Sequence, residues 1–213
     1  MEGFLNTDNI ERSTGGVEWH PLRPCIDKDT RVLFLGSFPP QRKKWAKGFN
    51  FFYPNFINDH WRIMGLIFYG DKDHFVDTKA RTYKGADIIR FVKEHGLGYY
   101  DTSEAVKRLK DNASDKFLEV VVPTDIRALT SMAPRLNKIV VTGQKAADTL
   151  CGYFKIDQHP KMGESVNIPY LYNSLGRPVK LCRLPSSSRA YPMRLEQKAE
   201  YYREMIEQQN IDN

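Results

Sequence analysis

The sequence contains few cysteines and lacks long apolar runs, and both features exclude whole classes of protein. Its 213 residues include only Cys25, Cys151 and Cys182. Three widely spaced cysteines cannot form a CxxC zinc pattern or a four-thiolate iron–sulfur set. No run approaches the roughly 18 apolar residues of a membrane span. The first residues, MEGFLNTDNIERS, contain acids and no apolar core, which argues against a signal peptide. We therefore expect a cytoplasmic protein with no membrane association, metal or cofactor.

The chain also lacks internal repeats and low-complexity tracts. Its hydrophobic fraction of 41% and charged fraction of 27% are those of an ordinary globular protein. A chain of this length can bury one sizeable core, so one domain is the default. We expect a polar, frayed lead-in over residues 1–16 and a single domain over residues 17–213. Nothing in the sequence indicates a species larger than a monomer.

Positive charge is unevenly distributed along the chain, whose formal net charge is +6. Residues 31–62 hold six basic residues and one acid, and residues 177–194 hold five basic residues and no acid. Residues 1–30, in contrast, carry six acids and three basic residues. Two basic segments favour a polyanionic partner such as nucleic acid. Charge alone leaves an unevenly charged, solvated surface equally open.

Apolar runs and turn signals alternate along the chain. They predict strands over residues 31–36, 96–101 and 138–143, and a hairpin in 165–184 whose second strand is buried. Helical patterns fall near 61–68, 88–95, 124–133, 144–152 and 195–206, and Gly70 is a plausible stop for the first. Residues 17–25 form an extended strap, and 71–83 and 103–123 give no clear signal. This alternation predicts an α/β three-layer fold, with a short, mainly parallel central sheet of about four strands flanked by helices.

Ligand sites in such sheets lie beyond the carboxyl ends of the strands. Three loops leave those ends: GSFPP, DTS and LPSSS. The first continues into FNFFYPNFINDHW (49–61), in which five residues are Phe or Tyr and three are Asn. We expect this ring-rich and amide-rich stretch to lie at the mouth of the site.

The segments LGSFPP, FNFFYPNFINDHW and LPSSSRAY, in this order, resemble the uracil-DNA glycosylase superfamily. The resemblance covers roughly residues 20–208 and is nearest to the mismatch-specific (thymine-DNA-type) and hypoxanthine-DNA glycosylase branches. It implies a DNA repair enzyme of base excision, which flips a deaminated base out of the duplex and hydrolyses its N-glycosidic bond. The implied partner is duplex DNA with a damaged or mispaired base, and no cofactor is implied.

The resemblance also assigns a base pocket. Tyr53 aligns with the aromatic residue that stacks on the extruded base, and the other implied pocket residues are Gly36, Ser37, Phe38 and Phe51. A stacked ring contributes about 1–3 kcal/mol per base. The residues alone leave open that these rings belong to the hydrophobic core, more so for Phe51 than for Tyr53.

Two polar residues are the candidate catalytic groups. Asn58 matches the Asn of the family's Asn-x-Phe-Trp motif, which reads Asn-Asp-His-Trp here, and it can hold a water molecule or the extruded base. Asp101 falls where the family places a residue that reads the edge of the base. For both residues, a helix cap is the alternative interpretation.

The candidate DNA contacts lie in the basic segments. The loop Ser186, Ser187, Ser188 and Arg189 matches the family loop that contacts phosphate and enters the vacated stack. An ordinary serine cap for the last helix is the alternative. The further candidate phosphate contacts are Lys43, Lys44 and Lys47, together with Lys107, Arg108 and Arg194.

Two positions depart from the family pattern. Phe38 stands where the uracil and thymine branches carry a water-activating Asp or Asn, and Leu184 stands where the uracil-specific branch carries His. Both departures argue against conventional uracil excision and favour the hypoxanthine-type branch, with Asn58 acting. They leave open a non-catalytic binder of damaged or mispaired DNA. The enzyme is expected to be monofunctional, since no lysine in a matching motif can form a Schiff base.

Overall fold

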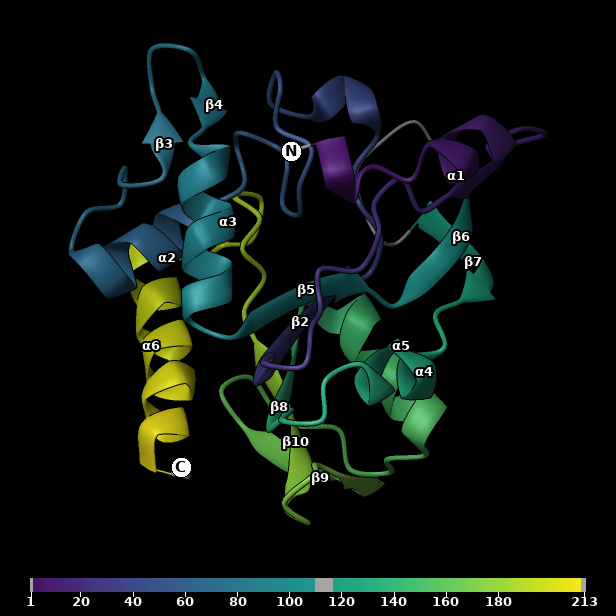
Figure 1. Cartoon of the computed structure of the whole chain (residues 1–213), viewed down its shortest axis with the longest axis vertical. Coiled ribbons are helices and arrows are strands. Elements are labelled where there is room, and N and C mark those ends of the chain that lie inside the picture. Colours follow the sequence, from purple (N-terminus) through teal and green to yellow (C-terminus); the bar gives the residue numbers. More distant parts are fainter. Residues whose placement is uncertain (1, 110–116, 212–213) are drawn as a thin grey trace.

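The computed structural model describes residues 2–109 and 117–211, which form an α/β fold in three layers (Figure 1). The central sheet has the strand order β5–β2–β8–β10–β9. Its strands are β2 (Val32–Gly36), β5 (Leu97–Asp101), β8 (Lys138–Thr142), β9 (Ser165–Tyr172) and β10 (Pro178–Leu184). The first four in the spatial order are parallel, and β9 pairs antiparallel with β10. The predicted three-layer, mainly parallel fold is confirmed, with five strands because β9 adds an edge to the sheet.

Helices cover both faces of this sheet. On one side lie α2 (His60–Tyr69), α3 (Gly85–Glu94) and α6 (Leu195–Ile211), and on the other lie α4 (Ile126–Ser131) and α5 (Gln144–Phe154) (Figure 1). Gly70 caps α2 in the left-handed region at φ 67°, which confirms the predicted stop. Strands covered on both faces read as near-continuous apolar runs, as β2 and residues 139–141 of β8 do.

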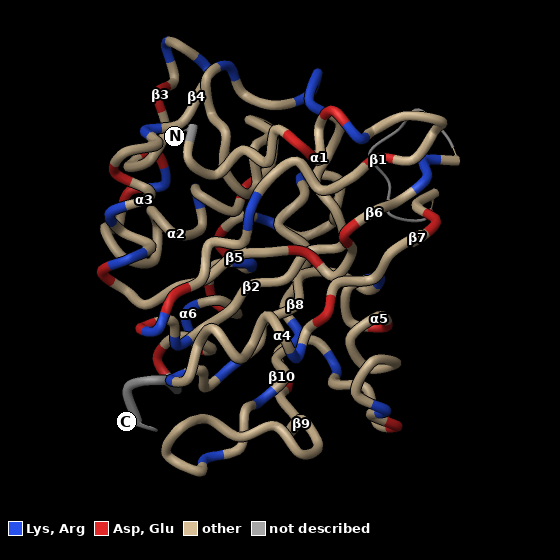
Figure 2. The backbone as a smooth tube through the Cα atoms, turned by 45° about the vertical axis from the view of Figure 1, so that its right-hand side comes forward, with Lys and Arg blue, Asp and Glu red and all other residues tan. Residues whose placement is uncertain are grey.

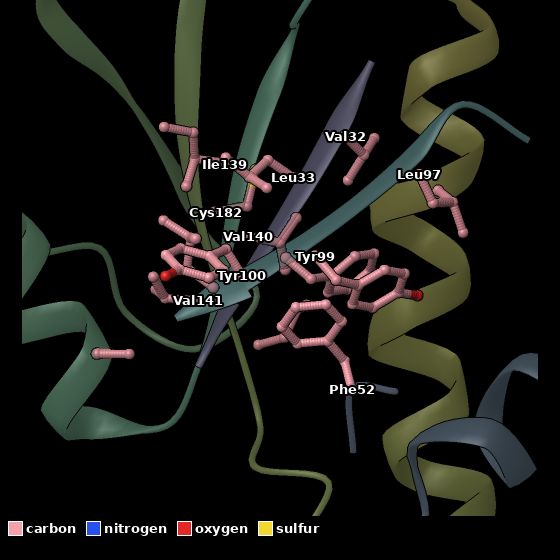
Figure 3. Close-up of a cluster of buried hydrophobic side chains, with 14 of the residues drawn as sticks. Val32, Leu33, Phe52, Leu97, Tyr99, Tyr100, Ile139, Val140, Val141 and Cys182 are labelled. Carbon is pink, nitrogen blue, oxygen red and sulfur yellow. The ribbon is translucent and has the colours of Figure 1, made fainter. Parts of the chain in front are cut away.

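The core follows the alternation of side chains along the strands. Figure 3 shows Val32 on the side of the sheet that faces α6 and Leu33 on the opposite side. Both side chains are fully buried. Tyr99 of β5 lies on the α6 side together with Phe52, at a ring-centroid distance of 5.9 Å. The sheet thus has an aromatic layer on one face and mainly aliphatic residues on the other.

A second, smaller sheet extends from the carboxyl end of β5. It consists of β1 (Val17–Trp19), β6 (Ser103–Arg108) and β7 (Leu118–Pro123), in the order β1–β6–β7. The predicted strap is therefore in part a strand, and 103–123 contributes two more, apart from 110–116, which lie outside the described residues. Thr102 alone separates β5 from β6, so the end of β5 lies where the two sheets meet. A two-stranded pair, β3 (Val76–Asp77) and β4 (Thr82–Tyr83), precedes α3.

The expectation of a frayed lead-in is wrong. A short 3-10 helix (Glu2–Phe4) and α1 (Thr7–Arg12) occupy this segment. The Phe4 ring packs edge-on against Phe51 at 4.9 Å between centroids, and the Asn9 side chain donates to the His20 carbonyl at 3.1 Å. A few side chains such as Phe4 hold this segment against the core. The sequence prediction missed them because it rested on the average polarity of residues 1–16.

Candidate active site

The loops after β2, β5 and β10 meet at the carboxyl edge of the central sheet, together with the start of α2. The Thr102 amide donates to the Gly36 carbonyl at 2.9 Å, which joins the first two loops. The Asp59 amide donates to the Ser187 carbonyl at 2.9 Å, and Asn58 forms an isolated bridge with Ser188. The segments singled out from the sequence therefore lie along the same edge of the sheet, where these contacts join them in two pairs.

Asp101 ends β5 and forms a buried pair with a residue that the sequence did not indicate. Its Oδ2 lies 2.8 Å from Nε2 of His20, which follows β1 and is fully buried. The other imidazole nitrogen lies 2.9 Å from the Leu22 carbonyl oxygen. His20 fixes the carboxyl group of Asp101, which is 6% exposed, and leaves Oδ1 as an acceptor.

Gly36 is required for this arrangement. A Cβ atom at position 36 would stand 2.3 Å from Oδ1 of Asp101, far inside van der Waals contact. The glycine of LGSFPP therefore permits the close approach of β2 to the Asp101 carboxyl group. Ser37, the next residue, is 9% exposed.

Phe38 turns its ring toward the second sheet. The ring packs with Val106 and Leu118, and the Arg108 guanidinium carbon lies 5.6 Å from its centroid. Phe38 is 8% exposed. The residue that departs from the family pattern thus fills the apolar junction between the two sheets.

Two cavities adjoin that junction on its outer side. One of about 340 Å³ is lined by residues of the 13–18 loop, and one of about 140 Å³ is lined by residues that include Trp19 and Phe38. Gln41 and Arg108 border both. These cavities have a mixed lining that includes polar groups, among them the buried Oε1 of Gln41, which has no hydrogen-bond partner among the described residues.

Most rings of the 49–61 stretch belong to the core. Phe49, Phe51 and Trp61 are fully buried, and the Trp61 indole donates to the Phe52 carbonyl at 3.0 Å. Phe51 therefore lies beneath the site, with its ring covered, which was the alternative interpretation. These rings anchor a long loop on the sheet, and the partly exposed residues of the stretch, Tyr53 among them, remain at its surface.

Tyr53 links this loop to the end of β8. Its backbone is in the left-handed region at φ 52°, and its hydroxyl lies 3.1 Å from Oγ1 of Thr142, so that either can donate. One face of the ring stacks on His60, with 3.8 Å between centroids and 12° between planes. The phenol is held at the carboxyl edge of the sheet by contacts on one face and at its tip.

His60, the first residue of α2, was also missed by the sequence reasoning. It is fully buried, its Nε2 lies 3.0 Å from the Tyr99 hydroxyl, and its Nδ1 has no partner in the described part of the chain. Burial holds the pKa of His60 well below its ordinary value of 6.5. The imidazole that supports Tyr53 is therefore neutral. Only its place between Asn58 and Trp61 could have drawn attention to it.

This lowered pKa gives a stability prediction. The unfolded chain takes up a proton on His60 below about pH 6.5, whereas the folded protein resists it, so stability should fall as the pH drops through that region. We expect the free energy of unfolding at pH 5 to be lower than at neutral pH by up to about 2 kcal/mol from this histidine alone. Urea unfolding should show that the free energy of unfolding falls less between pH 7.5 and pH 5 for His60→Phe than for the wild type. The phenylalanine ring keeps the stack on Tyr53 but takes up no proton. Equal losses would contradict the buried neutral state.

Asn58 is half-buried and lies two residues before α2, whose N-cap is Asp59. Its Oδ1 accepts the His60 amide at 2.9 Å, so the side chain forms a local turn at the start of the helix and is not the helix cap of the alternative interpretation. An amide oxygen has two acceptor positions, so one is left for a water molecule or a base. Asn58 and Asp101 lie on different segments of the same edge, and each has its side chain fixed by one hydrogen bond.

The 186–189 loop rests on Asp59 and α6. Arg189 donates from Nε to Oδ1 of Asp59 at 2.8 Å, and Lys198, also missed from the sequence, donates to the Ser188 carbonyl at 2.8 Å. The Tyr202 hydroxyl donates to the Pro185 carbonyl at 3.1 Å. Ser187 is buried, and Ser186 and Ser188 are partly exposed.

The predicted lysine contacts lie in a neighbouring segment. Lys43 and Lys44 belong to a 3-10 turn (Arg42–Lys44) after the β2 loop, and Lys47 follows it. Lys43 and Lys47 are exposed, and Lys44 is partly exposed. On α3 and α5, in contrast, Figure 2 shows both basic and acidic positions.

The cysteines do not offer a nucleophile. Burial raises the pKa of Cys25 to about 12 and that of Cys182 to about 11, so both thiols stay protonated at neutral pH.

The described residues contain no group of three or more His, Cys, Asp or Glu side chains placed to hold a metal ion. In the same part of the chain, no helix combines the length and apolarity needed to cross a membrane.

Comparison with known proteins finds a likeness among solved structures. No protein-family model matches the chain, and no curated protein matches it significantly. Among solved structures, it is similar to a solution NMR structure of a "putative Uracil DNA glycosylase from Methanosarcina acetivorans". That likeness has a TM-score of 0.55 at 21% identity and covers 90% of this chain and 99% of the other. At this identity the likeness establishes that the two proteins share a fold.

Proposed function

We propose that the protein is a DNA glycosylase that removes a deaminated base, with hypoxanthine preferred to uracil. The observation that carries the proposal is the position of Tyr53, Asn58, Asp101 and the 186–189 loop along one edge of the sheet. Tyr53, Asn58 and the 186–189 loop come from two of the segments that resemble the superfamily motifs, and Asp101 falls where the family places a residue that reads the edge of the base. The shared fold with the "putative Uracil DNA glycosylase" from Methanosarcina supports a DNA glycosylase in general and not the preference for hypoxanthine.

Each group has a role in this proposal. Tyr53 provides a ring for the extruded base, and the Oδ1 atom of Asp101 accepts a hydrogen bond from a donor on the base edge. Asn58 holds the attacking water through its remaining acceptor position. The exposed Arg189 and the lysines at 43, 44 and 47 bind backbone phosphates.

The proposed enzyme is monofunctional, uses no cofactor and acts as a monomer. Lys198 lies beside the 186–189 loop, but its side chain is 1% exposed and engaged by Asp59 and Ser188. A lysine in that state does not reach a sugar carbon to form a Schiff base. Water is therefore the nucleophile, and an intact strand with an abasic site is the product.

A panel of lesion duplexes tests the proposal. Labelled duplexes carrying hypoxanthine, xanthine or uracil are incubated with the protein and then treated with alkali. We expect alkali-dependent cleavage, fastest for hypoxanthine, and affinity that falls by about 10³-fold or more between 50 and 200 mM salt if six or more phosphates are contacted. Strand nicking without alkali, with a borohydride-trapped adduct, would refute the monofunctional assignment, and salt-independent binding would refute DNA as the partner.

A non-catalytic binder of damaged or mispaired DNA is the second candidate. It is favoured by Phe38, whose ring is committed to the junction of the two sheets and cannot orient water. This alternative predicts tight, salt-dependent binding to the same duplexes without product, and no effect of Asn58→Ala on affinity beyond the small loss from its local turn.

A further inference from the structure

One carboxylate, that of Asp59, lies between two cations at the base of the 186–189 loop. Oδ1 of Asp59 accepts from Nε of Arg189 at 2.8 Å, and Oδ2 lies 3.3 Å from Nζ of Lys198. The same Nζ donates to the Ser188 carbonyl at 2.8 Å. The cluster joins the start of α2, the loop and α6 in a single network.

The two cations differ sharply in their exposure. The Lys198 side chain is 1% exposed and that of Asp59 is 9% exposed, whereas the Arg189 side chain is 45% exposed. A buried lysine is costly unless it is paired, and Asp59 is its paired carboxylate. The formal charges of the cluster sum to +1, and the excess charge lies on its exposed member.

We propose that Lys198 is a positioning residue that keeps Arg189 available for a DNA phosphate, an inference that rests on the proposed function. Lys198 neutralises Asp59 from the buried side, so that the guanidinium of Arg189 retains an effective positive charge. A guanidinium has five N–H donors, and the hydrogen bond to Asp59 uses one of them, which leaves the others for phosphate oxygens. Lys198 thereby acts on DNA through Arg189 without touching it.

Removal of the Lys198 charge should therefore imitate loss of Arg189. In Lys198→Met the carboxylate of Asp59 has Arg189 as its remaining cation, and the pair is formally neutral. The slope of log affinity against log salt should become shallower by about 0.9, the value of one phosphate. Arg189→Met should give the same change, and the double variant Lys198→Met/Arg189→Met should show one such change and not two.

A rescue variant separates this role from a merely structural one. Asp59→Asn/Lys198→Met removes both buried charges with nearly the same volume and frees Arg189 again, so the wild-type slope should return. A structural role of Lys198 would leave the slope unchanged in the single variant or unrestored in the double variant, and either result overturns the proposal. Should the single variant fail to fold, the double variant must still give the wild-type slope.

The experiment is equilibrium binding of the full chain to an undamaged duplex, measured by fluorescence anisotropy from 50 to 300 mM salt. A second readout uses the wild type: the Arg189 Nε–H NMR signal, identified by its absence in Arg189→Lys, should shift when the duplex is added. An unshifted signal in a protein that binds DNA with a steep salt dependence overturns the inference alone. A wild type whose binding does not depend on salt overturns the proposed function instead.

Discussion

Asn58→Ala should lower the single-turnover rate of base excision by at least about 100-fold, the size of effect expected when a reacting group is no longer held in position. The structure places the Asn58 side chain at the edge where three loops meet, with its oxygen oriented by the His60 amide. Alanine cannot hold water there. The rate of hypoxanthine release from a duplex, with enzyme in excess over DNA, measures the effect.

Asn55 provides a matched control. Its Oδ1 accepts the Ile57 amide at 3.1 Å in a local turn of the same kind, three residues earlier. Asn55→Ala and Asn58→Ala should therefore lose similar stability, about 1 kcal/mol or less, while only the second loses excision. Equal loss of activity in both variants would indicate that Asn58 acts through the loop conformation and not on the reaction.

His20→Leu should destabilise the protein by about 3 kcal/mol or more, because it leaves a buried carboxyl group without its partner. His20 is fully buried, and Asp101 is 6% exposed, with 2.8 Å between Nε2 and Oδ2. Urea unfolding at pH 7.5 measures this loss, and the excision rate should fall together with it because Asp101 is no longer held.

Two variants make the test of the His20–Asp101 pair specific. His95→Leu removes a partly buried histidine at the end of α3, which contacts the Phe91 carbonyl oxygen, and should cost much less. In His20→Leu/Asp101→Leu no carboxyl group remains unpaired, so part of the stability should return. A double variant whose loss of stability equals the sum of the losses in His20→Leu and Asp101→Leu would show that the two side chains do not stabilise each other.

The regular elements of the central sheet were predictable because burial on both faces leaves a local signature. The apolar runs Val32–Leu35 and Ile139–Val141 show this signature. The end of α2 at Gly70 was predictable because it depends on a local property, the ability of glycine to adopt a positive φ. The second sheet escaped prediction because β1 and β6 are 86 residues apart in sequence at their Trp19–Ala105 contact and expose part of each strand. Partly exposed strands carry a weak alternation that resembles loop sequence.

For the candidate site, the sequence predicted only where its loops would lie. Parallel strands bring their carboxyl ends to the same edge of a sheet, so the position of the Gly36, Asp101 and Ser186 loops along one edge followed from topology. The buried groups His20, His60 and Lys198 did not, since each is defined by a contact with a distant segment. A motif identifies positions along a chain, whereas the partners that orient a side chain are known only from the fold.

Detection of the released base tests the central claim most directly. The wild type and Asn58→Ala are incubated with a duplex containing hypoxanthine, and free base and strand are measured separately by mass spectrometry. The account predicts free hypoxanthine in equal amount to an intact abasic strand for the wild type, and at least about 100-fold slower release for the folded variant. Tight, salt-dependent binding by the wild type with the base still attached to its sugar would contradict it and establish a lesion-binding protein.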